Sequence, residues 1–571
     1  METQRVLLAI VISMAILMTY QFLVVPQQPE KILQENIAEQ IDPLVESPMG
    51  AESIEPAQSQ LYSTAPAVTT GLPTSAENRE TPIEPVRLGR DIPVDTSLYS
   101  AIVSETGGGF KSFKLKQYKE SMDIDAGDKE LVATNETAWQ LPLYFFWGVD
   151  PSKARVPVLT ADKESVSVTG ESGKEILSMT SRLSSGVEIT RSLVFSNQDY
   201  LVQLEIDIFN NSPQQVHGTP YLSMTNKPFS PDAANRFLFN GPAVFSDNHL
   251  EEIKVKDLSD GPKTLKGNFK WVAYEDTYFM CGIIPQSDSS NAADANTIRF
   301  SVSDEDRVAT LLSGDLELIP PHGHKKYHYT IYFGPKKLDT LKAMGYDLDK
   351  IVNYGWFDII AKPALSLLNL LYRFVHNYGL AIVLVTIIFK LLLWPISQKG
   401  MKSMKTMQKI KPKMTKLQEK YKNDKERLNQ EMIKMYRTYK VNPIGGCLPM
   451  LVQIPLFFAL YKVLLQSIEL RHAPFMLWIT DLSAPDRLYL GFDIPYLGGL
   501  PVLTLLMGGS MFLQQKMTPA PLDPTQAKVM LFMPVLFTFM FINFSSGLVL
   551  YWFVNNLLSI AQQYLINRSP D

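Results

Sequence analysis

One lysine stands inside one of the most apolar stretches of the chain. In TIIFKLLLWP, residues 386–395, Lys390 is surrounded mainly by Ile, Leu, Phe and Trp. If this segment crosses a bilayer, a lysine near its middle costs roughly 2.5 to 3.5 kcal/mol, so such a group usually faces a helix-bundle interior or a wet cavity. Its chemistry would be electrostatic, namely the transient binding of an anionic or polar guest. The simpler alternative is that the side chain reaches the cytoplasmic interface, about 10 Å away.

Other polar residues interrupt apolar segments at comparable depths. Thr386 precedes Lys390 by four positions and therefore lies on the same face of a helix. The remaining polar positions are Gln453, Asn555, Asn556 and Ser559. Each of them alone could serve only to join neighbouring helices. Together they predict a hydrated cavity in which Lys390 is the one positive charge.

The sequence lacks the signatures of several other kinds of chemistry. No P-loop GxxxxGK[ST] is present, so ATP hydrolysis by that route is excluded. The apolar segments after residue 377 contain no Asp or Glu, which argues against a cation-coupled transporter. His322 and His324 form an isolated HGH that is typical of a polar turn rather than a metal site. We therefore expect no catalytic residue, no cofactor and no metal ion.

The elements that would position these polar residues are membrane helices. Val6–Val25 is an apolar run of about 20 residues, the length that a bilayer requires, and no A-x-A-like cleavage site follows it. We therefore expect an uncleaved N-terminal anchor, 1–25. With it, the chain has six predicted spans, of which five form the core. These five are Tyr378–Ser397, Pro443–Ser467, Leu497–Gln515, Ala527–Phe544 and Gly547–Leu565.

Composition and periodicity change twice between the anchor and the core. Residues 26–85 are rich in Pro, Gln, Ser, Thr and Glu and cannot bury enough apolar surface to fold, which indicates a flexible acidic linker. From residue 86 to about 345, apolar and polar residues alternate, as in LVQLEIDIF at 201–209. This period of two predicts a large β-sandwich. The fold class is thus a polytopic α-helical membrane protein with an extracytoplasmic β-sandwich domain.

The charges of the loops set the expected orientation. Between Gln398 and Lys440 there are 14 Lys and Arg against 4 Asp and Glu. Loops with such a positive excess stay in the cytoplasm. The connection 468–496 is acidic on balance, and Arg5 favours a cytoplasmic start for the anchor. Both termini would then be cytoplasmic, and the β domain would lie outside the cytoplasm.

Residues 354–377 carry a polar stripe on a largely apolar helix. The stripe consists of Asp358, Lys362, Ser366, Asn369 and Arg373. Because these residues recur every three or four positions and aromatic residues accompany them, the pattern is typical of a helix that lies in the membrane interface. An ordinary buried amphipathic helix is the alternative.

The basic segment 398–440 predicts two antiparallel helices with a turn at 422–424. Its charge fits a topology determinant, a nucleic-acid binder or a docking surface. Its methionines favour docking, because flexible and polarizable side chains adapt to varied apolar partners, and no motif for base readout is present. The alternative is that the methionines pack the hairpin against itself. The candidate docking residues are Met404, Lys405, Met407, Lys409, Met432 and Met435.

Four long motifs resemble the YidC/Oxa/Alb family of membrane protein insertases. They are YGLAIVLVTIIFKLLLWPIS, KVNPIGGCLPMLVQIPLFFALY, ELRHAPFMLWITDLSAPD and FMPVLFTFMFINFSSGLVLYWFVNN. The resemblance covers about 354–566 closely. The first span followed by a large external β domain is similar to the architecture of the Gram-negative members, which reside in the bacterial inner membrane with that domain in the periplasm.

The resemblance implies a five-helix core, within 346–571, whose groove opens to the cytoplasm and to lipid but is closed outward. It makes Lys390 the cation of this groove, with Thr386 and Gln453 as neighbours. It also implies an apolar slide on two spans, with the candidate residues Leu456, Phe457, Leu460, Phe532, Leu536 and Phe539. The external domain, 86–345, would be a β-supersandwich related to sugar-mutarotase folds without known catalysis.

The partners that the resemblance implies are nascent membrane proteins, the Sec translocon and the lipid bilayer. Ribosomes and signal-recognition components are further possible partners, and the signal-recognition components would dock on the hairpin 398–440. The family's groove cation is commonly arginine, whereas lysine keeps the charge but lacks the planar fork that binds a carboxylate at two points. Family members often end in a basic tail that helps hold ribosomes. This sequence stops at NRSPD, so the hairpin is expected to carry any ribosome contact.

The leading hypothesis is a membrane protein insertase and chaperone that works without covalent catalysis, alone or with the Sec translocon. The cavity would hydrate the polar tail of a client part-way across, and the apolar segment of the client would leave sideways into lipid. Two other hypotheses stay open. A membrane-tethered periplasmic carbohydrate-active enzyme would need paired carboxylates in a cleft of the β domain. A small-solute transporter would show solute flux without client insertion.

Overall fold

The computed structural model describes residues 89–568 with several gaps. The gaps are 133–140, 150–155, 171–172, 184, 230–237, 287–295, 304–306, 440–447, 493, 496 and 519–523. The predicted anchor Val6–Val25 and the predicted linker 26–85 lie outside the described residues, so both stay predictions.

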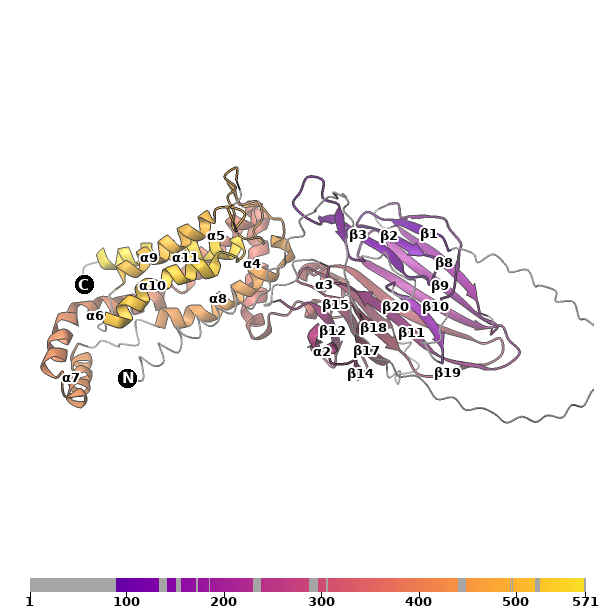
Figure 1. Ribbon diagram of the computed structural model, residues 1–571, viewed down its shortest axis with the longest axis horizontal. Coiled ribbons are helices and arrows are strands. Elements are labelled where there is room, and N and C mark those ends of the chain that lie inside the picture. Colours follow the sequence, from indigo (N-terminus) through magenta and orange to yellow (C-terminus); the bar gives the residue numbers. More distant parts are fainter. Residues whose placement is uncertain are drawn as a thin grey trace, which may run out of the picture. The chain divides into compact units, whose positions relative to one another are not determined.

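Alternation of apolar and polar residues between about 91 and 335 produces three β-sheets (Figure 1). The five-stranded sheet has the order β4 (Asp128–Glu130), β3 (Phe110–Lys119), β2 (Tyr99–Ser104), β1 (Asp91–Asp95) and β7 (Val166–Ser167). The nine-stranded sheet has the order β13 (His249–Glu252), β12 (Gly241–Ser246), β15 (Trp271–Glu275), β16 (Phe279–Gln286), β20 (His324–Pro335), β10 (Leu201–Asn210), β9 (Val187–Ser196), β8 (Lys174–Arg182) and β6 (Thr160–Ala161). The six-stranded sheet has the order β14 (Lys263–Gly267), β17 (Asn296–Ser303), β18 (Arg307–Ser313), β11 (Val216–Asn226) and β19 (Glu317–Ile319), with β5 (Tyr144–Gly148) also beside β11.

The two smaller sheets pack against one face of the nine-stranded sheet. At one end of β20, the ring of Phe333 lies 5.2 Å from that of Phe113 on β3. At the other end, the ring of Tyr327 lies 6.2 Å from that of Phe145 on β5. Positions 327 and 333 are an even number of residues apart and therefore lie on the same face of the strand. The predicted β-sandwich is confirmed.

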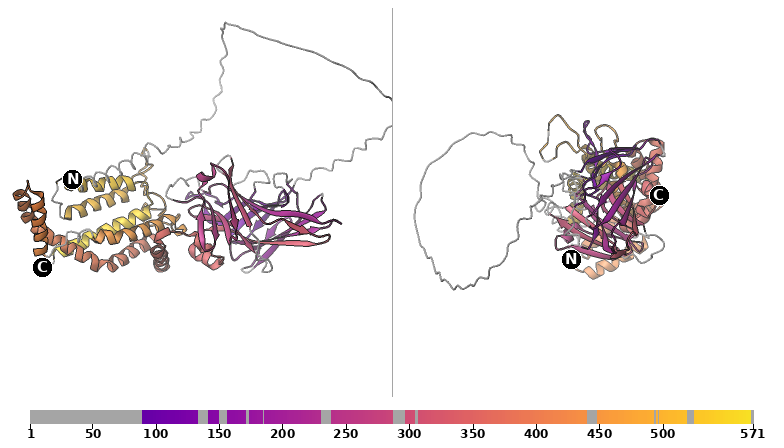
Figure 2. Two further views of the ribbon diagram at one scale, coloured as in Figure 1. Left: turned by 90° about the horizontal axis from the view of Figure 1, so that it is seen from below. Right: turned by 90° about the vertical axis from the view of Figure 1, so that its right-hand side faces the viewer.

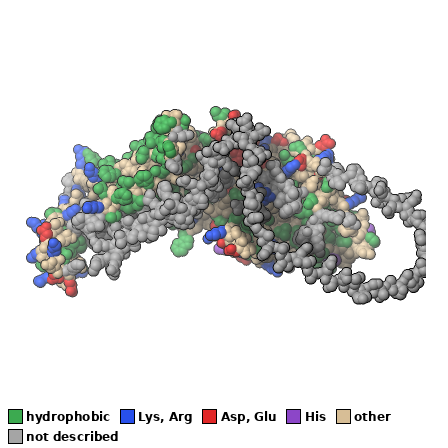
Figure 3. Space-filling view, viewed as in Figure 1, with side chains coloured by type: hydrophobic (Ala, Val, Ile, Leu, Met, Phe, Trp, Pro, Cys, Tyr) green, Lys and Arg blue, Asp and Glu red, His purple; other side chains and the backbone are tan. Residues whose placement is uncertain are grey.

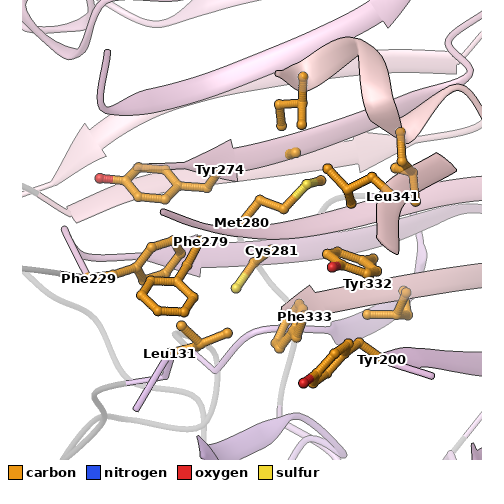
Figure 4. Packing of buried hydrophobic residues seen from close by; sticks show 14 of the residues in the cluster. Leu131, Tyr200, Phe229, Tyr274, Phe279, Met280, Cys281, Tyr332, Phe333 and Leu341 are labelled. Atoms are coloured by element: carbon orange, nitrogen blue, oxygen red, sulfur yellow. The ribbon is translucent and has the colours of Figure 1, made fainter. Parts of the chain in front are cut away.

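The central strands β15 and β16 differ from the predicted alternation because almost every residue in them is buried. Figure 4 shows Phe279 and Cys281 on the side of Phe229, and Met280 on the side of Leu341. Leu341 belongs to α3 (Leu338–Met344), which helps to cover the second face of the sheet. A strand that is covered on both faces has no solvent side, so its sequence reads as a continuous apolar run.

From residue 358 onward the described chain is largely helical. The helices are α4 (Asp358–Val375), α5 (Tyr378–Leu392), α6 (Trp394–Lys420), α7 (Lys425–Thr438), α8 (Leu448–Gln466), α9 (Val502–Met517), α10 (Pro524–Phe541) and α11 (Ser546–Arg568). The helix α2 (Val255–Leu258) lies in the β domain and is only about one turn long. Among the described helices, none alone is both long enough and apolar enough to cross a membrane. The pair α5 and α6 meets both conditions together, across a bend of 64°. The count of six spans therefore stays a prediction.

The predicted span Tyr378–Ser397 is broken at Leu393, where α5 ends and α6 begins. Pro395 lies in the first turn of α6. Proline has no N–H to donate to the preceding turn, and its ring clashes with the carbonyl group four residues earlier, so a helix that runs into it bends or ends. The prediction of one continuous span is therefore wrong here, because the break divides the lysine-bearing segment just after Lys390.

The predicted helical hairpin corresponds to α6 and α7. The chain turns at 421–424, as the sequence indicated, because Asp424 caps α7: its carboxylate accepts a hydrogen bond of 3.0 Å from the N–H of Arg427. Ile410, Met414 and Met435 form a small buried cluster between the two helices. This cluster is the core that holds the two helices of the hairpin together.

The helix α11 occupies the centre of the helical part and contacts α5, α6, α8 and α9. α9, α10 and α11 run side by side (Figure 1, Figure 2). Gly508 of α9 permits close contact with α10, because a Cβ atom there would lie only 2.1 Å from Oγ1 of Thr538. Small residues at such crossings let helices of membrane proteins pack closely.

Candidate functional site

Lys390 lies in the last turn of α5 and reaches across to α11. Its Nζ donates a hydrogen bond of 2.6 Å to Oγ of Ser559 and a longer one of 3.5 Å to Oδ1 of Asn555. Residues 555 and 559 are one helical turn apart, so both partners come from the same face of α11. Both partners are neutral, and within the described residues no carboxylate pairs with Lys390. The ammonium group is thus held in place without being neutralised.

A small cavity lies beside this ammonium group. Its lining comes from α5, α6, α8 and α11, together with the junction at Leu393, and consists of Thr386, Phe389, Lys390, Leu393, Ile396, Ser397, Val452, Gln453, Leu456, Tyr551 and Asn555. The space open to the centre of a water molecule is about 20 Å³, which accommodates about one water. The bend after Lys390 brings the end of α5 and the start of α6 to the same cavity.

Four of the five predicted groove residues meet at this cavity. The four residues that line it are Thr386, Lys390, Gln453 and Asn555. The Thr386 hydroxyl is buried and donates to the carbonyl oxygen of Ile382 at 2.7 Å, so its proton is already used. This back-bond leaves Thr386 only its oxygen lone pairs to offer a guest.

Asn556 does not join the other predicted groove residues. It is buried on another side of α11, where its Nδ2 donates to Oγ of Ser510 on α9 at 3.1 Å. Adjacent positions on a helix are about 100° apart, so Asn555 and Asn556 cannot both face α5. Asn556 joins two helices, which is the simpler role that a lone polar residue in a span often has.

Two polar residues at this site were missed in the sequence. Ser397 lines the cavity, and its Oγ lies 3.1 Å from Oε1 of Gln562, a fully buried residue of α11. The spacing of polar residues could have identified Gln562. It follows Ser559 by three residues and therefore continues the polar stripe of α11 toward α6. Ser397 gave a similar signal, since it follows Lys390 by seven residues and would share its face in a continuous helix, although the helix is broken at Leu393.

The predicted slide residues lie in two different environments. On α8, Leu460 is buried, Leu456 lines the cavity, and the ring of Phe457 packs edge-on against Trp552 of α11 at 4.6 Å. On α10, Phe532 and Phe539 are 62% and 57% exposed. Leu536 between them is half-buried. The exposed part of the predicted slide is therefore on α10, and Figure 3 shows broad apolar surface over the helical part.

The predicted docking residues of the hairpin are partly used within it. Met407 and Met432 pack around the small cluster that includes Met435. Met404 is half-buried, and Lys409 is exposed. Nζ of Lys405 donates to the carbonyl oxygen of Ile566 near the end of α11 at 3.3 Å, which ties the hairpin to the bundle. Figure 3 shows other Lys and Arg side chains at the α6–α7 end.

Comparison with known families covers both parts of the chain. A family model described as "YidC periplasmic domain" matches residues 91–367. A second family model, described as "60Kd inner membrane protein", matches residues 370–571. The boundary between the two matches falls within α4, just after the β domain ends.

Relatives extend this likeness to the whole chain. A protein of Geotalea uraniireducens named "Membrane protein insertase YidC" is 39% identical over 570 residues, 99% of each chain. One of the same name from Syntrophobacter fumaroxidans is 42% identical over 494 residues, which cover 83% of this chain and 86% of that one. A solved structure of an active YidC insertase aligns with 84% of this chain and 93% of its own at 19% identity, with a TM-score of 0.35. With full-length relatives at this level of identity, the chain belongs to the YidC family of membrane protein insertases, proteins of the inner membrane.

Proposed function

We propose that the chain inserts client polypeptides into the inner membrane by offering polar groups of the translocated tail a hydrated, positively charged cavity beside Lys390. No covalent step is involved. The observation that carries the proposal is the ammonium group at a cavity, whose partners in the described part of the chain are the neutral Ser559 and Asn555. Its charge is available for the carboxylate of a guest, because no acidic residue of the described chain already occupies it.

The free energies involved show that one contact between Lys390 and a client carboxylate would be enough to matter. An aspartate at the centre of a membrane helix costs roughly 2.5 to 3.5 kcal/mol. A hydrogen bond to a charged group contributes about 1.5 to 3 kcal/mol. One contact with Lys390 would therefore offset most of the cost of carrying one acidic side chain past the middle of the membrane. A second acidic residue would pass after the first has left.

Release of the client would proceed along the apolar slide. The exposed side chains Phe532 and Phe539 of α10 offer a surface to an apolar segment, whereas Leu456 of α8 stands at the cavity. A client segment that moves from the cavity to this surface and on into lipid would bury its apolar area, which is the driving force of insertion. Client insertion would need no nucleotide.

We infer the topology from the charges of the loops, and the separate family matches for residues 91–367 and 370–571 support the division into two parts. Residues 1–25 would form the anchor, 26–85 a linker, 86–345 the periplasmic domain and 346–571 the insertase core, with both termini in the cytoplasm. The basic hairpin 398–440 would then face the cytoplasm, where ribosomes and signal-recognition components would dock on its exposed side chains, such as Lys409. The Sec translocon would be a partner for larger clients.

Reconstitution with variants of Lys390 tests the proposal. The purified chain is placed in liposomes without ATP, and insertion is measured as protease protection of a single-span client that has an acidic translocated tail. Lys390→Arg keeps the charge and should insert the client at close to the normal rate. Lys390→Ala should slow it about tenfold or more, as expected for the loss of a hydrogen bond to a charged group, and Lys390→Glu should nearly abolish it.

A client with a neutral tail is the matched control, and Lys390→Ala should leave its insertion nearly unchanged. If Lys390→Glu inserted the acidic-tailed client as fast as the unaltered chain does, the electrostatic role of the lysine would be disproved. Solute flux through these liposomes in the absence of client insertion would instead favour a transporter.

A further inference from the structure

The hydroxyl group of Ser397 lies at the cavity beside Lys390 and is not hydrogen-bonded to the backbone of its own helix. Ser397 lines the cavity from the first turn of α6, and no back-bond from its Oγ to a carbonyl of its own helix is present. The hydroxyl groups of Thr386 and Ser559, by contrast, donate to carbonyl oxygens of α5 and α11. The direction of the Ser397 O–H bond is therefore decided by its partner, Gln562.

The amide of Gln562 is fully buried, and its two ends are unequally satisfied. Oε1 lies 3.1 Å from Oγ of Ser397, while Nε2 has no hydrogen-bond partner in the described part of the chain. A buried N–H donor without a partner carries its full desolvation cost. The oxygen and nitrogen of an amide exchange places by a half-turn of the side chain, so the hydrogen-bond network decides which one faces Ser397.

The better arrangement has the amide nitrogen facing the serine. Nε2 of Gln562 then donates to Oγ of Ser397, and the amide oxygen is left without a donor, which costs less than an orphaned N–H because unsatisfied acceptors are better tolerated. With its oxygen already accepting a hydrogen bond, the Ser397 hydroxyl keeps its proton free. Since this residue lines the cavity, that proton can be donated there.

We propose that Ser397, oriented by Gln562, is a second hydrogen-bond donor of the cavity and binds the same carboxylate or carbonyl oxygen of the client tail that contacts Lys390. Ser397 is seven residues after Lys390, and the bend at Leu393 brings both to one cavity. A lysine alone offers a carboxylate a point charge, whereas a lysine and a hydroxyl together hold both of its oxygens. Ser397 thus supplies the second contact that an arginine fork would supply.

This inference rests on the proposed function and is tested in the same liposome assay with two matched clients. The clients differ only in their translocated tails, which carry either Asp or Ala at the same positions, and the ratio of their insertion rates is measured. Ser397→Ala should lower the rate for the Asp tail roughly fivefold and leave the Ala tail unchanged, as expected for the loss of one hydrogen bond. Ser397→Thr, which keeps the hydroxyl, should restore the ratio.

Gln562→Leu tests the positioning role, since it removes the amide at nearly constant volume. It should lower the ratio in the chain that has Ser397 and cause no further loss in the chain that carries Ser397→Ala, because residues that act through one group are not additive. Ser510→Ala removes a buried serine hydroxyl that bonds Asn556 away from the cavity, and it should leave the ratio unchanged.

The outcomes separate the two proposals. If Lys390→Ala changes the ratio and Ser397→Ala does not, the role of Ser397 is disproved and the proposed function stands. If Ser510→Ala lowers the ratio as much as Ser397→Ala, or if Gln562→Leu adds its full effect to that of Ser397→Ala, the inference is likewise overturned. If Lys390→Ala leaves the ratio unchanged, the proposed function itself fails.

Discussion

The buried charges of this chain are held in two different ways. In the β domain, Lys336 forms an ion pair with Oε2 of the buried Glu275, and the buried Lys129 pairs with Oε2 of Glu120 at 2.6 Å. Among the described residues, Lys390 has only neutral partners, Ser559 and Asn555. A cation that is already paired with a carboxylate attracts a further anion only weakly. A cation among neutral acceptors keeps its attraction for an incoming anion. This difference is why Lys390 and not Lys336 suits the binding of a guest.

At the residue scale, Glu275 gives a pH-dependent stability. Burial raises its pKa to about 7 from an ordinary value of 4.5, although the ion pair with Lys336 lowers it. The folded state then holds the proton more tightly than the unfolded chain, so this stabilisation is present in full below pH 4.5 and is lost as the pH rises to about 7. The loss amounts to roughly 3 kcal/mol, at 1.36 kcal/mol per pKa unit.

Glu275→Gln should therefore flatten the dependence of the unfolding free energy on pH between 4.5 and 7, because a glutamine is neutral throughout. The measurement is chemical unfolding of the detergent-solubilised chain over this range. Glu251→Gln, which removes a half-buried glutamate that pairs with Lys263 at 2.6 Å, is the matched control and should keep the original slope. An equal slope for the original chain and Glu275→Gln would contradict the assignment.

At the element scale, the bend between α5 and α6 decides which residues share the cavity. A straight helix would carry Lys390 and Ser397 about 10 Å apart along its axis, at a rise of 1.5 Å per residue. The bend of 64° brings the start of α6 against the same cavity. Pro395 is the residue that accounts for it, because proline at this position interrupts the hydrogen bonds of a continuous helix.

Pro395→Ala should straighten this segment. Spin labels on cysteines introduced at the exposed positions Leu380 of α5 and Gln408 of α6, in a chain without its own two cysteines, report the distance between the two helices. Replacing the bend by a straight helix should lengthen that distance by ~6 Å, from the rise per residue and the angle. Pro412→Ala, beyond the second label, is the control. An unchanged distance in Pro395→Ala would show that packing against α8 and α11, rather than the proline, sets the bend.

The hairpin shows the same dependence on packing. Its charges and its period of 3.6 residues were readable in the sequence, and α6 and α7 are present with the turn where the sequence placed it. Three of the four candidate docking methionines, Met407, Met432 and Met435, pack between the two helices. A docking role for the hairpin would therefore depend mainly on its exposed basic residues.

At the scale of the whole molecule, the described residues that line the cavity all come from the helical part after residue 377. The β domain contributes none of these lining residues, although Arg471 after α8 donates hydrogen bonds to the carbonyl oxygens of Lys119 and Glu120. The buried side chains of its three sheets continue into the same hydrophobic cluster as those of the helical part. Because the described lining of the cavity comes from the helical part, the two parts can still differ in their importance for insertion.

Deleting most of 86–338 should leave much of the insertion activity, because the cavity and its cation remain. The loss of the Arg471 contacts should lower thermal stability modestly, on the order of 1 kcal/mol per hydrogen bond. The measurement is insertion of the acidic-tailed client in liposomes, with helix content followed by circular dichroism, and the same deletion combined with Lys390→Glu as the control. A deletion variant that keeps its helix content but does not insert the client would show that the β domain is needed for insertion. That result would favour the alternative in which the activity of the protein resides in the β domain.

The sequence by itself determined the kinds of element and the unusual residue among them. Hydropathy and periodicity are properties of neighbouring residues, so they could separate a β domain from a helical part and mark Lys390 as a cation in an apolar helix. They could also place Thr386 on the same helical face and the turn of the hairpin at 422–424. These results need no knowledge of how distant segments meet.

Only the tertiary structure decided which faces meet. The partner of Lys390 is Ser559, 169 residues further along the chain, and nothing local selects it over Asn556. The burial of β15 and β16 on both faces, the break at Leu393 and the pairing of Ser397 with Gln562 likewise depend on contacts between separate elements. Side-chain pattern fixes how each element is built, but the packing of elements against each other fixes which of its polar groups share a cavity.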